Sequence, residues 1–233
     1  MMPQQDTPPP LRRRLSRALV AREAITLADQ DGLGALSMRS LATRLGVVPM
    51  ALYKHVADKS DLIDRMVDVI VESYSEPKHS AGWRQKVRAR ALSAREAILA
   101  HPWLGQAIDT RTKRSETVLA HMNAVAGDFI EGGVSPDLTH YAMHTLGNRI
   151  WGYSPEAFAD VNAPTAADAH TPEIYAYMSN RFPYVVAIAM DAASRSPSHS
   201  CEQQSEFEFT LDLILEAVER LHLANWVSRP IEA

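Results

Sequence analysis

The sequence predicts an all-α fold, with a small helical domain at the N-terminus and a larger helical bundle after it. Apolar residues recur at steps of three and four through most of the chain, which is the period of amphipathic helices. Strand signals are nearly absent, because no Asn-Gly or Asp-Gly turn separates alternating apolar runs and β-branched residues never cluster for long. With 233 residues, 46% of them apolar, the chain can bury a sizeable core in one or two domains.

Three helices are predicted in the first sixty residues. The first spans roughly residues 14–31, and the glycine Gly32 then ends it. Ser37 can cap the second, since its hydroxyl can accept a hydrogen bond from a free amide of the next turn. Gly46 stops that helix. Pro49, whose ring is pre-set for the first helical position, opens a short third helix.

Longer amphipathic helices follow. Asp58 can cap a helix that runs to a break around Pro77. Between about 153 and 182, three prolines among Ala, Asp and Thr predict a loop with short helical pieces, and 183–193 is predicted as a short apolar helix. The apolar stripes of the long helices span residues 63–74, 87–98, 118–129, 138–150 and 207–223.

The last of these helices has apolar residues on two sides. Phe209 and Leu213 lie off the main stripe and widen the apolar surface, so that this helix is expected to have partners on both sides. The main stripe comprises Phe207, Leu211, Ile214, Val218 and Leu221.

Cysteine content and hydropathy predict a cytoplasmic protein. The single cysteine, Cys201, cannot form an intramolecular disulfide, and no apolar run approaches the roughly 18 residues that cross a bilayer. The N-terminus lacks the apolar stretch of a secretory signal. We therefore expect no membrane partner.

The net charge of −4 conceals a division of the chain. Residues 1–60 carry nine Lys and Arg against five acids, a charge of +4, whereas the remainder carries fifteen against twenty-three, a charge of −8. Phosphate binding needs basic residues concentrated on one surface. The basic segment and the acidic segment are thus expected to have different partners.

Residues 37–59 have the spacing of a helix-turn-helix, in which the second helix lies in the DNA major groove. If Leu52 and Val56 face inward, the advance of about 100° per residue leaves Pro49, Met50, Tyr53 and Lys54 facing out. A solvated helical hairpin inside an all-α protein has the same spacing, so the pattern alone leaves both interpretations open.

The outward side chains suit DNA. The Tyr53 ring can pack on a sugar or a thymine methyl while its hydroxyl meets a phosphate, and Pro49 and Met50 can contact thymine. Arg39 can bind a guanine with two hydrogen bonds or clamp a phosphate, and the sequence leaves both open. The residues suited to phosphates are Lys54, His55 and Lys59.

The segment ALVAREAITLADQDGLGALSMRSLATRLGVVPMALYKHVADKSDLI, within about residues 15–65, resembles the N-terminal domain of the tetracycline-repressor (TetR) family of transcription regulators. The resemblance implies a homodimer of all-α subunits that binds a double-stranded DNA operator. The pair Val48-Pro49 departs from the more polar residues often found there, which favours apolar or shape readout. The positions that match DNA-contacting sites of the family are Arg39, Pro49, Met50, Tyr53, Lys54, His55 and Lys59.

The rest of the chain is similar to the tetracycline-repressor-like C-terminal type, through HPWL at 101–104 and GGVSP at 132–136. The resemblance implies that the helix from Pro136 and the helix from Glu206 form a four-helix dimer interface; the alternative is that they only fill the monomer core. The implied domains are a flexible basic arm (1–14), a helix-turn-helix domain (15–60), a linking helix (61–78) and a ligand-binding and dimerisation domain (79–228).

The arm PPPLRRRLSR is consistent with further phosphate or minor-groove contacts, or with a solvated tail.

An effector pocket is expected among the helices between about 84 and 190, apolar with a few placed polar groups. The candidates are bulky or polar residues within mostly apolar helices, although for each one ordinary core or surface packing is favoured over ligand contact: Trp103, His121, Met122, Tyr141, His144, Asn148 and Trp151.

His140 and His144 have a spacing that can bind a metal from one helix face, but no Glu or Cys completes a site, so we predict no metal and no cofactor. No histidine aligns convincingly with the metal-binding position of tetracycline-binding members of the family, so a magnesium-tetracycline effector is not carried over from it.

Together these features predict a ligand-responsive transcriptional regulator, a repressor that a small-molecule effector releases from a near-palindromic operator. One alternative is an all-α ligand-binding or scaffold protein that does not bind DNA. Another is an enzyme, which the sequence disfavours because it has no Gly-x-Ser-x-Gly, phosphate-cradling Gly loop or Cys/His motif.

Overall fold

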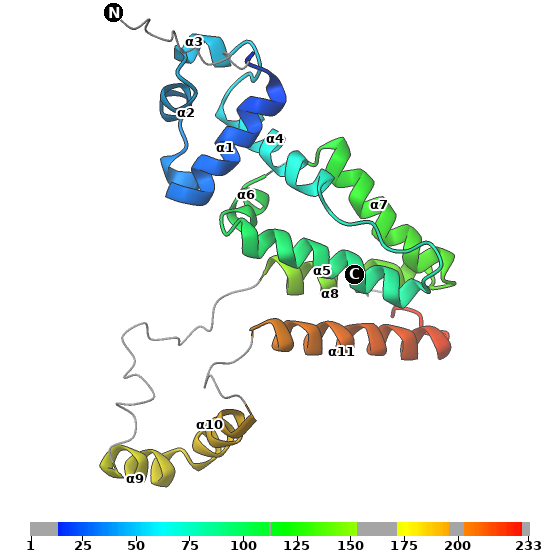
Figure 1. Cartoon of the computed structure of the whole chain (residues 1–233). Coiled ribbons are helices and arrows are strands. Elements are labelled where there is room, and N and C mark those ends of the chain that lie inside the picture. The colour runs from blue at the N-terminus through cyan, green and yellow to red at the C-terminus, as the bar shows by residue number, and fades with distance from the viewer. Residues whose placement is uncertain (1–13, 112, 153–171, 196–202, 230–233) are drawn as a thin grey trace, which may run out of the picture. The chain divides into compact units, whose positions relative to one another are not determined.

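The computed structural model describes residues 14–111, 113–152, 172–195 and 203–229, and its regular secondary structure in these ranges is entirely helical (Figure 1). The prediction of an all-α fold is confirmed. Two compact units form, one up to Gly133 and one from Val134. No helix within the described ranges is both long and apolar enough to cross a membrane.

The described part of the first unit contains seven α-helices and a short 3-10 turn (Figure 1). They are α1 (Arg17–Asp31), the turn η1 (Leu33–Ala35), α2 (Met38–Leu45), α3 (Pro49–Leu52), α4 (Lys59–Glu72), α5 (Trp83–Ala100), α6 (Leu104–Asp109) and α7 (Glu116–Glu131). The second unit contains α8 (Pro136–Trp151), α9 (Pro172–Arg181), α10 (Pro183–Arg195) and α11 (Gln203–Leu223).

The predicted helix caps of the N-terminal domain are confirmed. Ser37 and Ser40 form a capping box at the start of α2: Ser37 Oγ accepts from the Ser40 amide at 3.0 Å, and Ser40 Oγ accepts from the Ser37 amide at 2.9 Å. Gly46 ends α2 with a φ of 64°, a left-handed conformation that glycine adopts without strain. Asp58 caps α4 by accepting from the Asp61 amide at 2.9 Å.

α3 is shorter than predicted. Leu52 and Val56 are buried as expected, but the helix ends at Leu52 and residues 53–55 form hydrogen-bonded turns. The amides of His55 and Val56 both bond the Leu52 carbonyl, at 2.8 and 3.1 Å. The pattern therefore identified the buried face correctly while overestimating the length of the helix.

α4 connects the N-terminal helices to the rest of the first unit. It packs against α1 on one side and against α6 and α7 on others. Its buried residues are Leu62, Met66, Val67 and Ile70. Polar contacts add to this packing, because Asp64 pairs with Arg111 and Asp68 accepts from Ser115 Oγ at 2.5 Å. A movement of α6 or α7 therefore acts directly on α4.

The ends of α5 and α7 meet at Trp83. The Trp83 ring lies 5.4 Å, centroid to centroid, from the ring of the buried Phe129. A Cβ atom at Gly132 would lie 2.4 Å from Trp83 Cβ and 2.5 Å from Cγ. Both atoms are close to the backbone of α5 and cannot swing away, so only glycine fits at this position.

Gly132→Ala is therefore expected to destabilise the protein by roughly 1–3 kcal/mol, the usual result of overpacking. Urea unfolding followed by circular dichroism measures the effect. Gly127→Ala is the matched control, because Gly127 lies on α7 where an added Cβ atom would meet only open space, and alanine favours the helix by roughly 1 kcal/mol. Equal stability changes in the two variants would show that the contact with Trp83 does not restrict position 132 to glycine.

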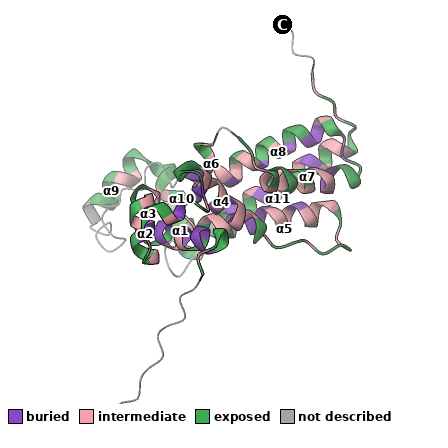
Figure 2. Ribbon diagram, turned by 90° about the horizontal axis from the view of Figure 1, so that it is seen from above, coloured by how far each residue is buried: buried purple, intermediate pink, exposed green. Residues whose placement is uncertain are grey.

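In the second unit α8 packs against α11. α8 buries Leu138, Thr139, Ala142, Leu146 and Ile150, and α11 buries Phe207, Leu211, Leu215 and Val218. Figure 2 shows that both helices also carry exposed residues.

The residues buried on the inner face of α11 are not all those that the apolar stripe predicts. Leu215 is fully buried, whereas Ile214 and Leu221 are only partly buried. Phe209 and Leu213 are 67% and 49% exposed, which leaves the predicted second apolar side without a partner within the described part of the chain.

α9 and α10 follow the proline-containing segment. α9 is a ten-residue helix that starts at Pro172, where a missing amide hydrogen costs nothing, so the predicted loop with short helical pieces ends in a regular helix. α10 extends two residues beyond the predicted end, to Arg195. Residues 1–13 of the basic arm, most of the proline-containing loop and Cys201 lie outside the described residues.

Candidate nucleic-acid interface and ligand cavity

The turn from α2 into α3 exposes apolar side chains. Val48, Met50 and Tyr53 are 68%, 72% and 48% exposed, although the neighbouring Leu52 is fully buried. Pro49 is exposed beside them at the first position of α3. Exposed apolar residues on a capped, ordered turn are typical of a contact surface.

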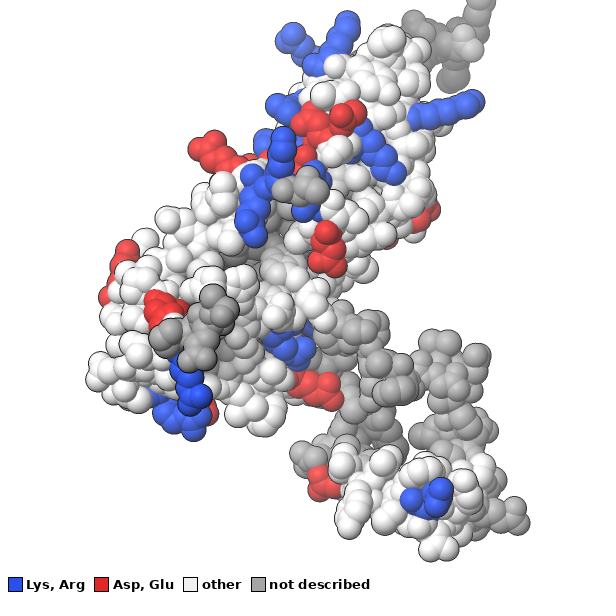
Figure 3. Space-filling view, turned by 180° about the vertical axis from the view of Figure 1, so that it is seen from behind, with Lys and Arg blue, Asp and Glu red and all other residues white. Residues whose placement is uncertain are grey.

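Cationic side chains surround this turn. Arg39, Lys54 and Lys59 are exposed, and within the described ranges none of them forms a salt bridge, while His55 is partly buried. Figure 3 shows Lys and Arg side chains projecting from the N-terminal domain, at the top of that view. The seven predicted DNA-contacting residues thus lie on α2, α3 and the turns up to the start of α4; we call them the α2–α3 surface.

Two other arginines of the domain form ion pairs within the fold. Arg44 Nε bonds Glu23 at 3.1 Å, and its Nη1 donates to Gln30 at 2.9 Å. Arg17 pairs with Asp61 at 3.2 Å. Arg44 and Arg17 are therefore partly neutralised by acidic partners, whereas the exposed cations of the α2–α3 surface, and Arg22 on α1, form no salt bridge within the described ranges.

Asp29, near the end of α1, joins the N-terminal helices to the turn between α5 and α6. Its Oδ1 accepts from the indole Nε1 of Trp103 at 2.7 Å and lies 2.8 Å from Nδ1 of His101. Trp103 is buried, so its N–H would be costly to leave without this acceptor. We call these three residues the Asp29 joint. The indole N–H of Trp103, a predicted pocket residue, thus bonds to the protein itself in this joint.

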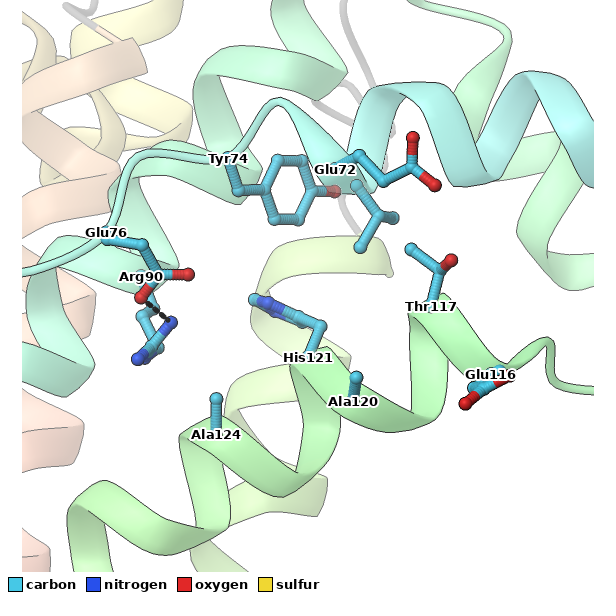
Figure 4. A pocket seen from close by; sticks show the side chains of 10 residues that line it. Glu72, Tyr74, Glu76, Arg90, Glu116, Thr117, Ala120, His121 and Ala124 are labelled. Carbon is cyan, nitrogen blue, oxygen red and sulfur yellow. Dashed lines mark ion pairs between the residues drawn. The ribbon is translucent and has the colours of Figure 1, made fainter.

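A cavity of about 400 Å³, which we call the α4–α7 cavity, lies between the end of α4, α5 and α7, entirely within the first unit (Figure 4). Its size falls in the range of small-molecule sites, roughly 300–1,000 Å³. The residues that line it are Val71, Glu72, Tyr74, Glu76, Arg90, Glu116, Thr117, Ala120, His121 and Ala124.

Tyr74 and His121 meet edge to face in the cavity, with ring centroids 5.0 Å apart and planes at 80° (Figure 4). The Tyr74 hydroxyl is buried and has no hydrogen-bond partner among the described residues. Burial raises the pKa of Tyr74. Burial lowers the pKa of His121, the charge of Arg90 lowers it further, and Glu76 opposes them. Both rings are therefore neutral near pH 7.

Arg90 is held from two sides. Its Nε donates to Asp128 Oδ2 at 2.7 Å, and its Nη1 lies 3.0 Å from Glu76 Oε2, the ion pair drawn in Figure 4. Asp128 is buried on α7, so this pair joins α5 to α7, and Glu76 brings the α4–α5 loop to the same place. The arrangement fixes the wall of the cavity and neutralises the Arg90 charge.

The lowered pKa of His121 makes stability depend on pH. Below the ordinary histidine pKa of 6.5 the unfolded chain binds a proton more readily than the folded chain, so the free energy of unfolding falls as the pH decreases from about 7. His121→Gln removes this contribution, and we expect its stability to decline less than that of the wild type between pH 7 and 5. Urea unfolding at several pH values measures the difference. Parallel declines would mean that His121 is protonated freely in the folded state.

The other predicted pocket residues lie elsewhere. Met122 is next to His121 on α7 but does not line the cavity. Tyr141, His144, Asn148 and Trp151 lie on α8 in the second unit; Tyr141 packs edge to face on Trp226 at 5.5 Å.

Sequence reasoning missed most of the lining residues. Tyr74 is the last residue of the predicted apolar stripe but lies two residues beyond the end of α4, and Arg90 lies one turn after the buried Val87, on the inner side of α5. A charged residue at that helical position is the signal that could have identified Arg90.

The two histidines with metal-ligand spacing, His140 and His144, have ring centroids 4.7 Å apart on an exposed face of α8. Within the described residues, no group of three or more His, Cys, Asp or Glu side chains is arranged to hold a metal ion.

Comparison with known proteins gives the family. Residues 76–221 match the sequence profile of the tetracycline repressor-like C-terminal domain. An HTH-type transcriptional regulator of Saccharopolyspora erythraea is 30% identical over 61% of this chain, and the match spans 65% of that regulator, just under two thirds. The class C tetracycline repressor of Escherichia coli is 26% identical over 91% of this chain and 94% of its own length.

The fold agrees with that assignment. The crystal structure of ActR, a TetR-family protein of Streptomyces coelicolor, in complex with actinorhodin has a TM-score of 0.68 and 24% identity, covering 89% of this chain and 98% of that chain. The helix-turn-helix domain, the helical bundle and these matches agree. The chain therefore belongs to the tetracycline-repressor family of DNA-binding, ligand-responsive transcriptional regulators.

Proposed function

We propose that two copies of this chain repress transcription by binding a near-palindromic operator through the α2–α3 surface, and that a small molecule in the α4–α7 cavity releases them. The observation that carries the proposal is the α2–α3 surface itself. Exposed Met50 and Tyr53 stand beside Lys54 on α3 and the turn after it, which follow the Gly46 cap of α2 and are anchored by the buried Leu52. Apolar side chains suit thymine methyls and sugars, and the cations suit phosphates.

The second unit supports self-association. Phe209 and Leu213 on α11 and Tyr141 on α8 remain exposed after α8 and α11 have packed together. A second copy that covers the same residues would make a two-fold symmetric four-helix interface. The two α2–α3 surfaces would then read half-sites about one helical turn, roughly 34 to 36 Å, apart or a multiple of it.

The cavity and the Asp29 joint support control by an effector. The cavity wall is built from α4, α5 and α7, and α4 also packs on α1. The Asp29 joint ties α1 to the α5–α6 turn at a second point. A ligand that shifts α5 or α7 therefore changes the orientation of the α2–α3 surface. By thermodynamic linkage, the ligand lowers the affinity for DNA by the same factor by which DNA lowers the affinity for the ligand.

This proposal assigns the chain no catalytic role, no cofactor and a cytoplasmic location. The relative ActR was solved with actinorhodin, which supports a small organic molecule as the kind of effector.

The test is a mobility shift with the DNA upstream of the chain's own gene, repeated at 50, 100 and 200 mM salt. The proposal predicts a specific, salt-dependent complex. Equal binding to this DNA and to a scrambled duplex would contradict it.

A further inference from the structure

The charge of the α4–α7 cavity is negative. Among the described residues, three glutamates line it, Glu72, Glu76 and Glu116, against one cation, Arg90. Arg90 is already neutralised by Asp128 and Glu76, at 2.7 and 3.0 Å. An anionic ligand would have to displace one of these carboxylates, so the wall disfavours it.

Few cationic side chains balance the two remaining carboxylates, although Glu116 lies in the first turn of α7, near the positive end of that helix. Glu72 has only a loose pair, 3.6 Å from Arg65, and Glu116 forms no salt bridge within the described ranges. The cations that follow one another just before α7, Lys113 and Arg114, do not line the cavity. The potential at Glu72 and Glu116 therefore favours a positive group.

The shape of the cavity suits a flat ring. Thr117, Ala120 and Ala124 recur at steps of three and four, so their short side chains share one face of α7. In Figure 4 the Tyr74 ring lies across the cavity from this face. The His121 ring stands on the same helix and meets Tyr74 edge to face, so a planar group can stack on the Tyr74 ring beside this histidine, next to the small residues.

The Tyr74 hydroxyl gives the cavity a polar group. Its oxygen is buried and unpaired among the described residues, and burial raises the pKa of Tyr74, so that the group stays protonated. A neutral phenol oxygen can accept a hydrogen bond from an N–H of a ligand. Buried polar groups without partners are rare in native proteins, and a ligand that completes the bonding explains this one.

We propose that the effector of this cavity is a planar aromatic cation, with its ring stacked on Tyr74 next to the small residues of α7 and its positive charge at Glu72 and Glu116. The inference rests on the proposed function, in which this cavity is the effector site. An aromatic amine fits both features, because its N–H groups reach the Tyr74 oxygen while its charge is balanced by the carboxylates.

The test uses three tricyclic probes of similar size that differ in charge. They are proflavine, a cation, acridone, which is neutral, and acridone-10-acetate, an anion. Binding to the DNA-free, full-length protein is followed by probe fluorescence, since proflavine also binds DNA directly. We expect proflavine to bind at least about tenfold more tightly than acridone and acridone more tightly than the anion.

Variants locate the bound probe. Glu72→Gln with Glu116→Gln is expected to weaken proflavine binding at least about fivefold and to leave acridone binding unchanged. Tyr74→Phe is expected to weaken proflavine without lowering the stability of the free protein, because the hydroxyl has no partner among the described residues to lose. Glu96→Gln, an exposed glutamate of α5 that does not line the cavity, is the matched control and should change nothing.

Tighter binding of acridone or of the anion would overturn the ligand class but leave the cavity as the effector site. Proflavine binding that survives all the cavity substitutions would place the probe elsewhere and overturn the proposal. Failure of all three probes to bind would also overturn it. The proposed function is tested separately by the mobility shift, which contains no probe.

Discussion

Replacing Tyr53 and Lys54 together by alanine is expected to abolish specific DNA binding while the protein stays folded. Both side chains are exposed, so removing them leaves no cavity in the domain. Contacts to base edges and sugars contribute roughly 1–3 kcal/mol each, so the affinity for the operator should fall about a hundredfold or more. Fluorescence anisotropy at fixed salt measures the loss, and circular dichroism checks the fold.

The salt dependence of DNA affinity distinguishes the contribution of Lys54 from that of Tyr53. Lys54→Ala alone should reduce the slope of log affinity against log salt by about one, as expected for one lost phosphate contact. Tyr53→Ala should weaken specific binding with a smaller change in slope. The controls are Lys113→Ala and Tyr184→Ala, which remove an exposed lysine and an exposed tyrosine from other parts of the chain. Equal losses in the controls would mean that the α2–α3 surface does not read DNA.

Breaking the Asp29 joint is expected to weaken operator binding for a different reason. Asp29→Ala removes the acceptor of the buried Trp103 N–H, and an unsatisfied buried donor costs about 1–3 kcal/mol. The N-terminal helices then lose one attachment to the rest of the first unit, while the packing of α1 on α4 remains. We expect operator affinity to fall about tenfold because the orientation of the α2–α3 surface is no longer fixed.

The slope of log affinity against log salt distinguishes a loss of orientation from a loss of phosphate contacts. No phosphate contact is lost in Asp29→Ala, so the slope should stay as in the wild type. Asp31→Ala is the matched control, because Asp31 is an exposed aspartate of the same helix that forms no hydrogen bond or salt bridge within the described ranges. If Asp29→Ala lowers stability but binds the operator as tightly as the wild type, the joint is structural only.

The helices of the N-terminal domain could be predicted closely from sequence because interactions between residues close in the chain determine where they begin and end. Ser37, Gly46 and Asp58 act on the residues next to them, through caps and a left-handed turn, and each does what the sequence predicts. The length of α3 was overestimated because the apolar spacing of Leu52 and Val56 is also satisfied by a helical turn followed by two tight turns. Periodicity identifies the buried face but not where the helix ends.

The cavity could not be predicted because its walls come from helices that are distant in the sequence. Only His121 among the predicted pocket residues lines it. Trp103 looked like a ligand contact, but its partner Asp29 lies 74 residues earlier, and no local pattern connects the two. Bulky and polar residues in an apolar helix mark a contact of some kind, and only the packing of helices decides whether the partner is a ligand or the protein itself.

The most direct test of the central claim is the stoichiometry and specificity of DNA binding by the wild-type protein. Titration of a labelled duplex from upstream of its own gene, followed by anisotropy and by analytical ultracentrifugation, measures both. We predict two chains per near-palindromic site, with at least about a thousandfold preference over a scrambled duplex at physiological salt. Binding by a single chain, or equal affinity for the two duplexes, would contradict operator recognition by a dimer.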